Sequence, residues 1–310
     1  MTSIKTVAVL GGSGNLGPAL INELLSAGFS VTAVTRSNSD STTPNFPANV
    51  PVKPVDYASV DALKAAFTGH DAVVSVVGAP GVPAQRVAID AAVAAGVRRF
   101  IPSEFGIHTR RVRGTPIGRI LEGKIGVVDY LEGVVEREGE KGRGFSWTGV
   151  STGLFFDWGL DRTGLGVISL KDRTATVIDS GDEKWYASTL AQVGRAVAGI
   201  LKHPDETANK YLATASFNLS QNELVALVEE LTRSKFPVTR IKSADLQREG
   251  EVKLAAGDYS AFVDLLRVHN SADGAGNGLP EEESANGVIG VPYEDVRAAV
   301  ESWLRREGAL

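Results

Sequence analysis

The chain has 310 residues, of which 43% are hydrophobic and 22% are charged, and its formal net charge is −5. This composition is typical of a globular protein that can bury a sizeable core. The absence of cysteine excludes disulfides, thiolate metal sites and a cysteine nucleophile, and the absence of a long basic run argues against a nucleic-acid partner. The four histidines lack metal-ligand spacing, and no apolar run reaches the ~18 residues of a membrane span. We therefore expect a cytoplasmic protein with no metal site, membrane segment or signal peptide.

A glycine-rich turn near the N-terminus is the most informative local feature. An apolar run over residues 6–10 predicts a strand, GGSGNLG follows at residues 11–17, and apolar residues then recur at helical spacing. A strand that leads through such a turn into a helix can hold a pyrophosphate, because glycines let the backbone approach and the helix N-terminus offers free N–H groups. The predicted cofactor-binding residues of this turn are Gly11, Gly12, Ser13, Gly14, Asn15, Leu16 and Gly17.

The residue after the second predicted strand, residues 30–35, indicates which dinucleotide the chain binds. Arg36 stands there, and no carboxylate follows until Asp40. An acidic residue at this place accepts hydrogen bonds from the ribose 2′-OH, whereas an arginine accommodates a 2′-phosphate. The sequence therefore favours NADP(H) over NAD(H), with an ordinary surface arginine as the alternative. Residues 37–51 have the composition of a loop.

Strands and helices continue to alternate through the first half of the chain. Strands are predicted over 52–55 and 72–78, at Phe100 and Ile101, and over 145–150, and helices over 59–67 and 85–95. This alternation predicts an α/β fold with a doubly wound parallel Rossmann sheet. Ligands of such sheets lie beyond the carboxyl ends of the strands. The glycine turn, Arg36, Gly78 and the segment PSEFG at 102–106 should therefore share one edge.

A helix predicted over residues 119–138 carries a lysine on its apolar face. At about 100° per residue, its apolar side chains fill one broad arc, and Lys124 falls near the middle of that arc. Desolvation would lower the pKa of this lysine toward the range useful for proton transfer. In the alternative interpretation, the aliphatic stem runs along apolar surface and the amine reaches solvent. The periodicity alone leaves both open.

The second half has a different character, with aromatic residues among short segments and glycine turns. It predicts helices over 187–201, 221–233, 258–268 and 293–306, strands over 210–219 and 238–241, and a polar loop over 270–287. We expect an NADP-binding Rossmann domain at 1–152, to which residues 185–205 return. A smaller C-terminal substrate-binding region is expected at 153–184 and 206–310.

Several stretches together carry a family resemblance. They are GGSGNLG at Gly11, Arg36, FTGHDAVVSVVG from Phe67, AAGVRRFIPSEFG from Ala94 and LSQNELVALVEEL from Leu219. Over nearly the whole chain they resemble the isoflavone reductase-like and NmrA-like family of atypical short-chain dehydrogenases, which includes pinoresinol–lariciresinol and phenylcoumaran benzylic ether reductases. The resemblance implies an NADPH-dependent reductase whose catalytic group is a lysine on the helix after PSEFG. Lys124 matches that lysine.

The match has one departure near this lysine. In the plant reductases an arginine pair follows the lysine four and five residues on, whereas Val128 and Asp129 stand in those places here; the following Glu132 matches. This departure puts the plant substrates in doubt more than the chemistry. None of the six tyrosines has a lysine four residues later, so the Tyr-x-x-x-Lys dyad of standard short-chain dehydrogenases is absent.

These interpretations predict the reduction of an aromatic or polyketide-like small molecule. Hydride would pass from NADPH to a carbonyl, a conjugated alkene or a benzylic ether or quinone-methide-like carbon, and Lys124 would donate or relay the proton. The alternative is an NmrA-like sensor that binds NADP(H) and a protein partner without catalysis. The sequence indicates neither the substrate nor the oligomeric state.

Other candidate residues keep two interpretations each. Ser103 in PSEFG could touch the nicotinamide or only cap the turn. His108 could take part in a lid or be a solvated bystander, and the arginines at 110, 111 and 113 could bind an acidic substrate or be solvated. The aromatic residues near Phe155 could grip a substrate or pack a core; they are Phe155, Phe156, Trp158, Trp185 and Tyr186.

Overall fold

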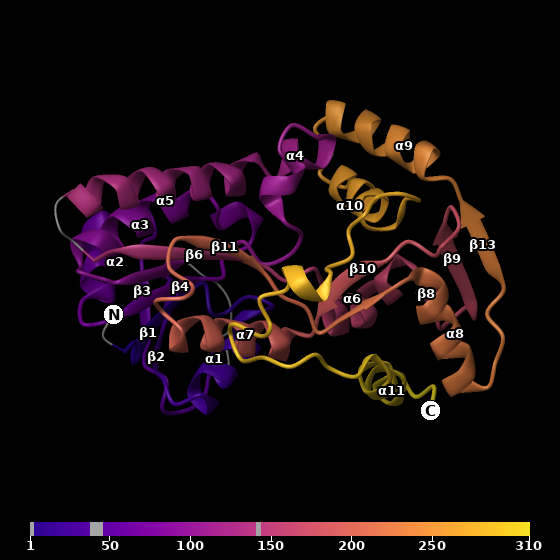
Figure 1. Ribbon diagram of the computed structural model, residues 1–310, viewed down its shortest axis with the longest axis horizontal. Coiled ribbons are helices and arrows are strands. Elements are labelled where there is room, and N and C mark those ends of the chain that lie inside the picture. Colours follow the sequence, from indigo (N-terminus) through magenta and orange to yellow (C-terminus); the bar gives the residue numbers. More distant parts are fainter. Residues whose placement is uncertain (1–2, 38–45, 141–143) are drawn as a thin grey trace.

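A parallel sheet of seven strands forms the centre of the computed structural model, which describes residues 3–37, 46–140 and 144–310. Its strand order is β11-β6-β5-β4-β1-β2-β3, and every neighbouring pair is parallel (Figure 1). The strands are β1 (Thr6–Leu10), β2 (Ser30–Arg36), β3 (Val52–Val55), β4 (Ala72–Ser75), β5 (Arg99–Ile101), β6 (Ser146–Ser151) and β11 (Lys210–Ala213). The α/β class and the Rossmann-like sheet are confirmed.

Helices cover both faces of this sheet (Figure 1). On one face lie α1 (Gly17–Ser26) and α7 (Leu190–Lys202), and on the other α2 (Val60–Phe67), α3 (Ala84–Ala94) and α5 (Glu122–Glu140). Each face has its own apolar cluster, one including Leu20 and Val197, the other Phe67 and Val127. Because both faces are buried, the strands read as almost continuous apolar runs rather than as alternating ones.

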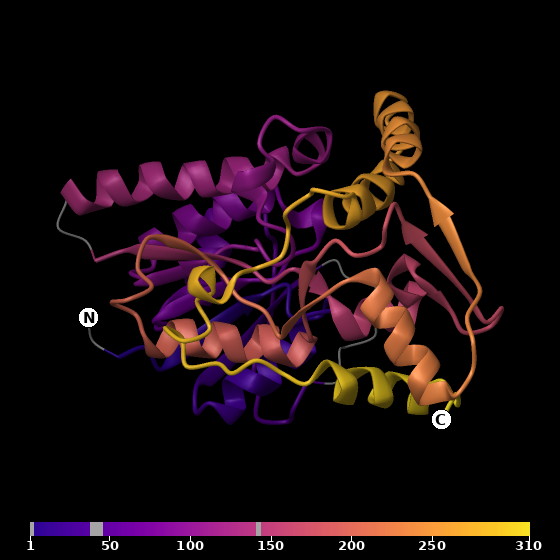
Figure 2. The ribbon, with the colours of Figure 1, turned by 45° about the vertical axis from the view of Figure 1, so that its right-hand side comes forward.

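A second part of the molecule lies beside the sheet and begins at the carboxyl end of β6 (Figures 1 and 2). One of its small sheets joins β7 (Leu154–Phe155), β10 (Trp185–Ser188) and β12 (Phe217–Leu219), and the other joins β8 (Ile168–Ser169), β9 (Thr174–Ile178) and β13 (Val238–Ile241). Its helices are α6 (Phe156–Thr163), α8 (Gln221–Thr232), α9 (Ser243–Ala255), α10 (Ala261–Ser271) and α11 (Val296–Arg306). None of the helices in the described part of the chain is long and apolar enough to cross a membrane.

The short helix α4 (Pro116–Ile120) precedes α5 and contacts α10. The sequence predicts one helix over 119–138, but Leu121 (φ −93°, ψ 6°) separates α4 from α5. The start of α4 is fixed by Thr115, whose hydroxyl caps the Gly118 N–H (3.2 Å). A small apolar cluster joins this region to α10; its buried members are Ile107, Val112, Ile117, Ala261 and Leu265.

Two further predicted elements are divided in the structure. Residues 210–219 form β11 and β12 in different sheets, because the side-chain oxygen of Asn286 accepts from the Thr214 hydroxyl (2.6 Å) and the Ala215 N–H (3.1 Å) and so holds a bend. The helix predicted over 187–201 begins at Leu190, after β10, where the Thr189 hydroxyl caps it. The helix α9 was not predicted.

The predicted division of the chain at residues 152 and 206 remains a prediction. One strand crosses the predicted boundary. β11 lies within 206–310, which is predicted to bind substrate, but it pairs with β6 in the seven-stranded sheet. The returning segment 185–205 contains α7, which packs on α1.

Candidate active site

The glycine turn connects β1 to α1 with very little space around its backbone. Gly11 has φ +84°, in the region that favours glycine. A Cβ at Gly17 would lie 1.9 Å from the Gly12 carbonyl oxygen, so only glycine fits there. The apex, residues 13–15, is exposed. A turn that is closely packed at Gly17 and exposed at residues 13–15 allows a pyrophosphate to approach the main chain.

No side chain caps the first turn of α1, in which the Gly17 N–H donates to the Gly14 carbonyl oxygen at 3.2 Å and Pro18 has no N–H. Leu16 is the N-cap residue and offers no capping hydrogen bond, and no acidic residue occupies the first turn. Helix N-termini carry unsatisfied donors and a partial positive charge, so they stabilise anions. The predicted residues Gly11 to Gly17 lie together in the turn between β1 and α1, and their binding of a pyrophosphate stays a prediction.

Arg36 is the last residue of β2, next to the glycine turn in the sheet. Its side chain is exposed and makes no hydrogen bond or ion pair with any described residue. An arginine without an internal partner is available to a 2′-phosphate. Of the predicted loop over 37–51, residues 38–45, including Asp40, lie outside the described residues.

Tyr57 ties the glycine turn to the end of β2. Its hydroxyl donates to the Val34 carbonyl oxygen (2.7 Å) and accepts from the Gly11 N–H (3.1 Å), and burial raises the pKa of Tyr57 to about 12. The phenol therefore stays protonated and keeps both hydrogen bonds at neutral pH. Sequence reasoning missed this residue, because a tyrosine two positions after a short strand carries no motif.

Gly78 and Ser103 lie at the ends of β4 and β5, on the same edge as the glycine turn. Gly78 is exposed and has open space around it. Ser103 is buried; its hydroxyl donates to the Val77 carbonyl oxygen and its N–H donates to Gln85 Oε1, both at 2.8 Å. The Ser103 hydroxyl therefore links the segments that follow β4 and β5, its N–H contacts α3, and its contact with the nicotinamide stays a prediction.

Lys124 lies in the first turn of α5 and reaches the same edge of the sheet. Its Nζ donates to the Phe105 carbonyl oxygen at 3.5 Å and its half-buried side chain lines a cavity. Burial lowers the pKa of the Lys124 ammonium, and the neighbouring Glu104 opposes this shift. The Lys124 side chain thus lines the cavity.

A buried hydrogen-bonded cluster lies behind the PSEFG segment. Glu104 is fully buried; one carboxyl oxygen accepts from the Tyr211 hydroxyl (2.9 Å) and from the Thr109 hydroxyl. The other, Oε1, has no partner among the described residues. Burial raises the pKa of Glu104 against the influence of Lys124. Burial thus favours the neutral form of each group, while the charge of the other group favours the ionised form.

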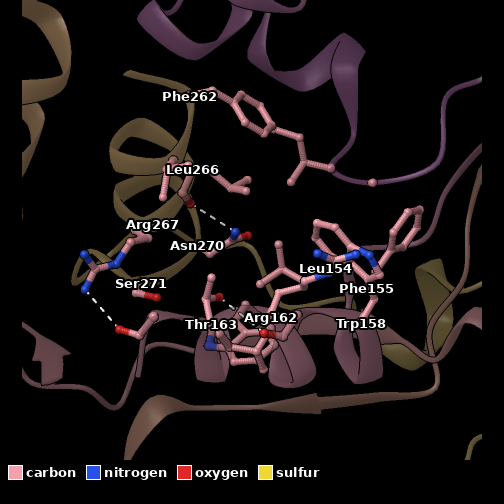
Figure 3. Close-up of a pocket in the computed structure, with 18 of the residues that line it drawn as sticks. Leu154, Phe155, Trp158, Arg162, Thr163, Phe262, Leu266, Arg267, Asn270 and Ser271 are labelled. Carbon is pink, nitrogen blue, oxygen red and sulfur yellow. Dashed lines mark hydrogen bonds between the residues drawn. The ribbon is translucent and has the colours of Figure 1, made fainter. Parts of the chain in front are cut away.

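The cavity beside Lys124 has a volume of about 520 Å³ and mostly apolar walls. One wall comes from residues 105–107, Thr109 and Lys124, and another from Leu154, Phe155 and Trp158 of β7 and α6. The third wall is α10, with Phe262, Leu266 and Asn270 (Figure 3). This volume suits a drug-sized organic molecule.

The predicted aromatic residues divide between the cavity and the core. Phe155, Trp158 and Trp185 line the cavity. Phe156 is fully buried and packs edge-on against Phe217, with ring centroids 4.6 Å apart. Phe156 therefore packs a core, and the contact of the cavity-lining members with a substrate stays a prediction.

The basic loop residues do not line this cavity. Arg110, Arg111 and Arg113 form surface ion pairs with Glu132 (2.6 Å), Glu283 (2.7 Å) and Asp129 (2.6 Å), and these pairings favour the solvated interpretation. His108 stacks on Tyr211, with ring centroids 4.4 Å apart. It therefore supports the buried cluster around Glu104.

The environments of two histidines predict that the folded protein loses stability at acidic pH. Burial, with Arg111 and Arg110 nearby, lowers the pKa of His108 to about 4 despite Glu283, and burial lowers the pKa of His269 to about 4. Unfolding would restore values near 6.5, so the unfolded chain binds more protons below that pH and stability falls as the pH falls from about 6.5 to about 4. Denaturant unfolding across this range should show that loss, and His108→Phe, which keeps a ring on Tyr211, should reduce it. An unchanged pH slope in the variant would contradict the assignment.

Comparison with known proteins identifies the family. The model of the NmrA-like family matches residues 3–255. The chain belongs to this family. The oxidoreductase poxI of Penicillium oxalicum is 34% identical over 267 residues, covering 82% of this chain and 78% of the relative. The oxidoreductase aprR of Aspergillus flavus is 32% identical over 304 residues, covering 96% of this chain and 98% of the relative.

A solved structure of AtPrR2 with NADP+ and (+)pinoresinol has the same fold. Its TM-score is 0.80, at 21% identity, with 98% of this chain and 99% of that chain covered. The family assignment confirms the predicted resemblance. It leaves the roles of individual residues as predictions.

Proposed function

We propose that this NmrA-like family member is an NADPH-dependent reductase of an aromatic or polyketide-like small molecule. The observation that carries the proposal is one amine, that of Lys124, which lines a largely apolar cavity of about 520 Å³ at the edge of the sheet where the glycine turn lies. The oxidoreductase names of poxI and aprR support it, as does the bound NADP+ of AtPrR2.

The cofactor would be held by the residues at the carboxyl ends of β1, β2, β4 and β5. Gly11 to Gly17 and the N–H groups of α1 would bind the pyrophosphate, and Arg36 would bind the 2′-phosphate. Gly78 and Ser103 would border the nicotinamide. NADPH supplies a hydride to an electrophilic carbon of the substrate when it is bound.

Lys124 would supply the proton that balances the added hydride. Its Nζ transfers a proton to the substrate oxygen or carbon that gains negative charge, and recovers one from solvent. The lowered pKa of Lys124 makes the release of this proton to the substrate easier than for an exposed lysine. The Phe105 carbonyl holds the amine at the cavity wall, and the apolar walls keep competing water away.

A substrate panel tests this proposal. The purified protein with NADPH is offered quinones, isoflavones, chalcones and lignan-type ethers, and consumption of NADPH is followed by its absorbance. Turnover of at least one class is expected. Tight NADPH binding without turnover of any class would instead favour the sensor function.

Replacement of Arg36 tests the cofactor assignment separately from catalysis. Arg36→Ala removes charge-assisted hydrogen bonds to the 2′-phosphate, so NADPH affinity should fall roughly 10–100-fold while NADH affinity stays unchanged. Binding is measured by the change in NAD(P)H fluorescence. Arg248→Ala, which alters an exposed arginine on α9, is the control and should change neither affinity. Equal losses for NADPH and NADH in Arg36→Ala would show that Arg36 does not bind the 2′-phosphate.

A further inference from the structure

The C-terminal end of α10 carries two polar side chains into the otherwise apolar cavity. Asn270 and Ser271 both line the cavity, and they are only 6% and 5% exposed. Figure 3 shows the Asn270 amide extending from α10 toward the middle of the cavity. Polar groups buried to this degree normally have hydrogen-bond partners.

The orientation of the Asn270 amide is fixed by its neighbour. Its Nδ2 donates to the Leu266 carbonyl oxygen at 3.0 Å. A carbonyl can only accept, so the nitrogen must face Leu266 and the oxygen Oδ1 must face the cavity. Oδ1 accepts no hydrogen bond from any described residue, and the Ser271 hydroxyl has no partner among them either.

The other side-chain acceptors of this wall already have partners, whereas Arg267 Nε and Trp185 Nε1 have no partner among the described residues. Gln221 Oε1 accepts from the Ile178 N–H (2.7 Å), and the Thr163 hydroxyl donates to the Gly159 carbonyl oxygen (3.2 Å). Arg267 turns away from the cavity and donates to the Gly166 carbonyl oxygen (3.1 Å), as Figure 3 shows. Among the described residues, the side-chain acceptors without a partner at this end of the cavity are therefore Asn270 Oδ1 and the Ser271 hydroxyl.

We propose that Asn270 and Ser271 form a subsite for a neutral hydroxyl group of the substrate. The substrate is then an aromatic molecule with a hydrogen-bond donor, such as a phenol, at the end bound against α10, and with its electrophilic carbon at the wall that holds Lys124. A methyl ether in place of the hydroxyl cannot donate and leaves Oδ1 buried without a partner. A carboxylate likewise has no proton to donate to Oδ1. This inference rests on the proposed function for the position of the reacting carbon.

Matched pairs of ligands test the subsite by binding, independently of turnover. The probes are para-hydroxychalcone and para-hydroxybenzylideneacetone, each beside its para-methoxy counterpart, and affinity for the NADP+-loaded protein is measured by calorimetry. The hydroxyl form of at least one pair should bind about tenfold more tightly or better. Asn270→Leu, which keeps a side chain of similar size, should abolish that preference, and Ser271→Ala should reduce it.

Two controls make the result decisive. Thr163→Val alters a hydroxyl that already has a partner, so the ratio of hydroxyl to methoxy affinity should keep its wild-type value. NADP+ binding by each variant shows that it is folded. Equal affinities within both pairs, no binding of any probe, or a preference that survives Asn270→Leu would overturn the subsite. A normal binding preference in a protein that reduces no compound would contradict the reductase function and leave the subsite standing.

Discussion

Lys124→Ala should lower turnover by about 10²–10⁴-fold while leaving NADPH binding intact. General acid–base groups contribute factors of this size, and the amine lines the cavity and contacts the Phe105 carbonyl rather than the glycine turn. The measurement is the rate of NADPH consumption with a substrate from the panel, beside NADPH affinity from fluorescence. Loss of NADPH binding together with turnover would mean that the lysine supports the cofactor site instead.

Two further variants separate proton transfer from charge and packing. Lys124→Arg keeps a positive charge but holds its proton at any accessible pH, so it should be almost as inactive as alanine. Lys124→Met keeps the apolar stem and should also be inactive. Lys202→Ala, at the exposed end of α7, should retain full turnover. High turnover in the methionine variant would show that another group supplies the proton.

Gly17→Ala should destabilise the protein and weaken cofactor binding together. The new Cβ would lie 1.9 Å from the Gly12 carbonyl oxygen, a backbone atom that cannot rotate away. Such overpacking costs about 1–3 kcal/mol or more, which exceeds the roughly 1 kcal/mol that alanine gains over glycine inside a helix. Tm should fall by several degrees, and NADPH affinity should fall about tenfold or more, because the displaced turn no longer presents its N–H groups.

Gly14→Ala is the matched control in the same turn. Its Cβ would meet the Gly11 carbonyl oxygen at 3.5 Å, which is an ordinary contact. Its Tm should therefore remain close to that of the wild type. If both variants unfolded at the wild-type temperature, the crowding at Gly17 would be relieved by a movement of α1 and the prediction would be wrong.

Local patterns in the sequence predict most of the first half of the fold. Strand, glycine turn and helix from Thr6 to Ser26 follow from short-range signals, and so does the start of α8, where Ser220 and Glu223 form a capping box. The helix α9 escapes prediction because it lies largely exposed and carries few buried side chains, Leu246 among them. A helix without an apolar stripe gives no periodic signal.

The candidate site is predictable only in part, for a related reason. Lys124 stands out because it interrupts an apolar arc, and the glycine turn because of its spacing. Tyr57, Glu104 and Asn270 carry no such mark. Each acquires its place through a contact distant in the chain: Tyr57 with Gly11, Glu104 with Tyr211, and Asn270 through the position of α10 across the cavity. Long-range contacts of this kind leave no periodic trace in one sequence.

The small apolar cluster beneath α10 has a consequence for how such proteins diversify. Ala261 and Leu265 rest on Ile107, Val112 and Ile117, apart from the clusters on the two faces of the central sheet. We therefore expect mutations that reshape α10 to leave the dinucleotide-binding fold intact, so that substrate preference can change while the cofactor site is kept. Natural selection can thus alter substrate preference through substitutions in α10 alone.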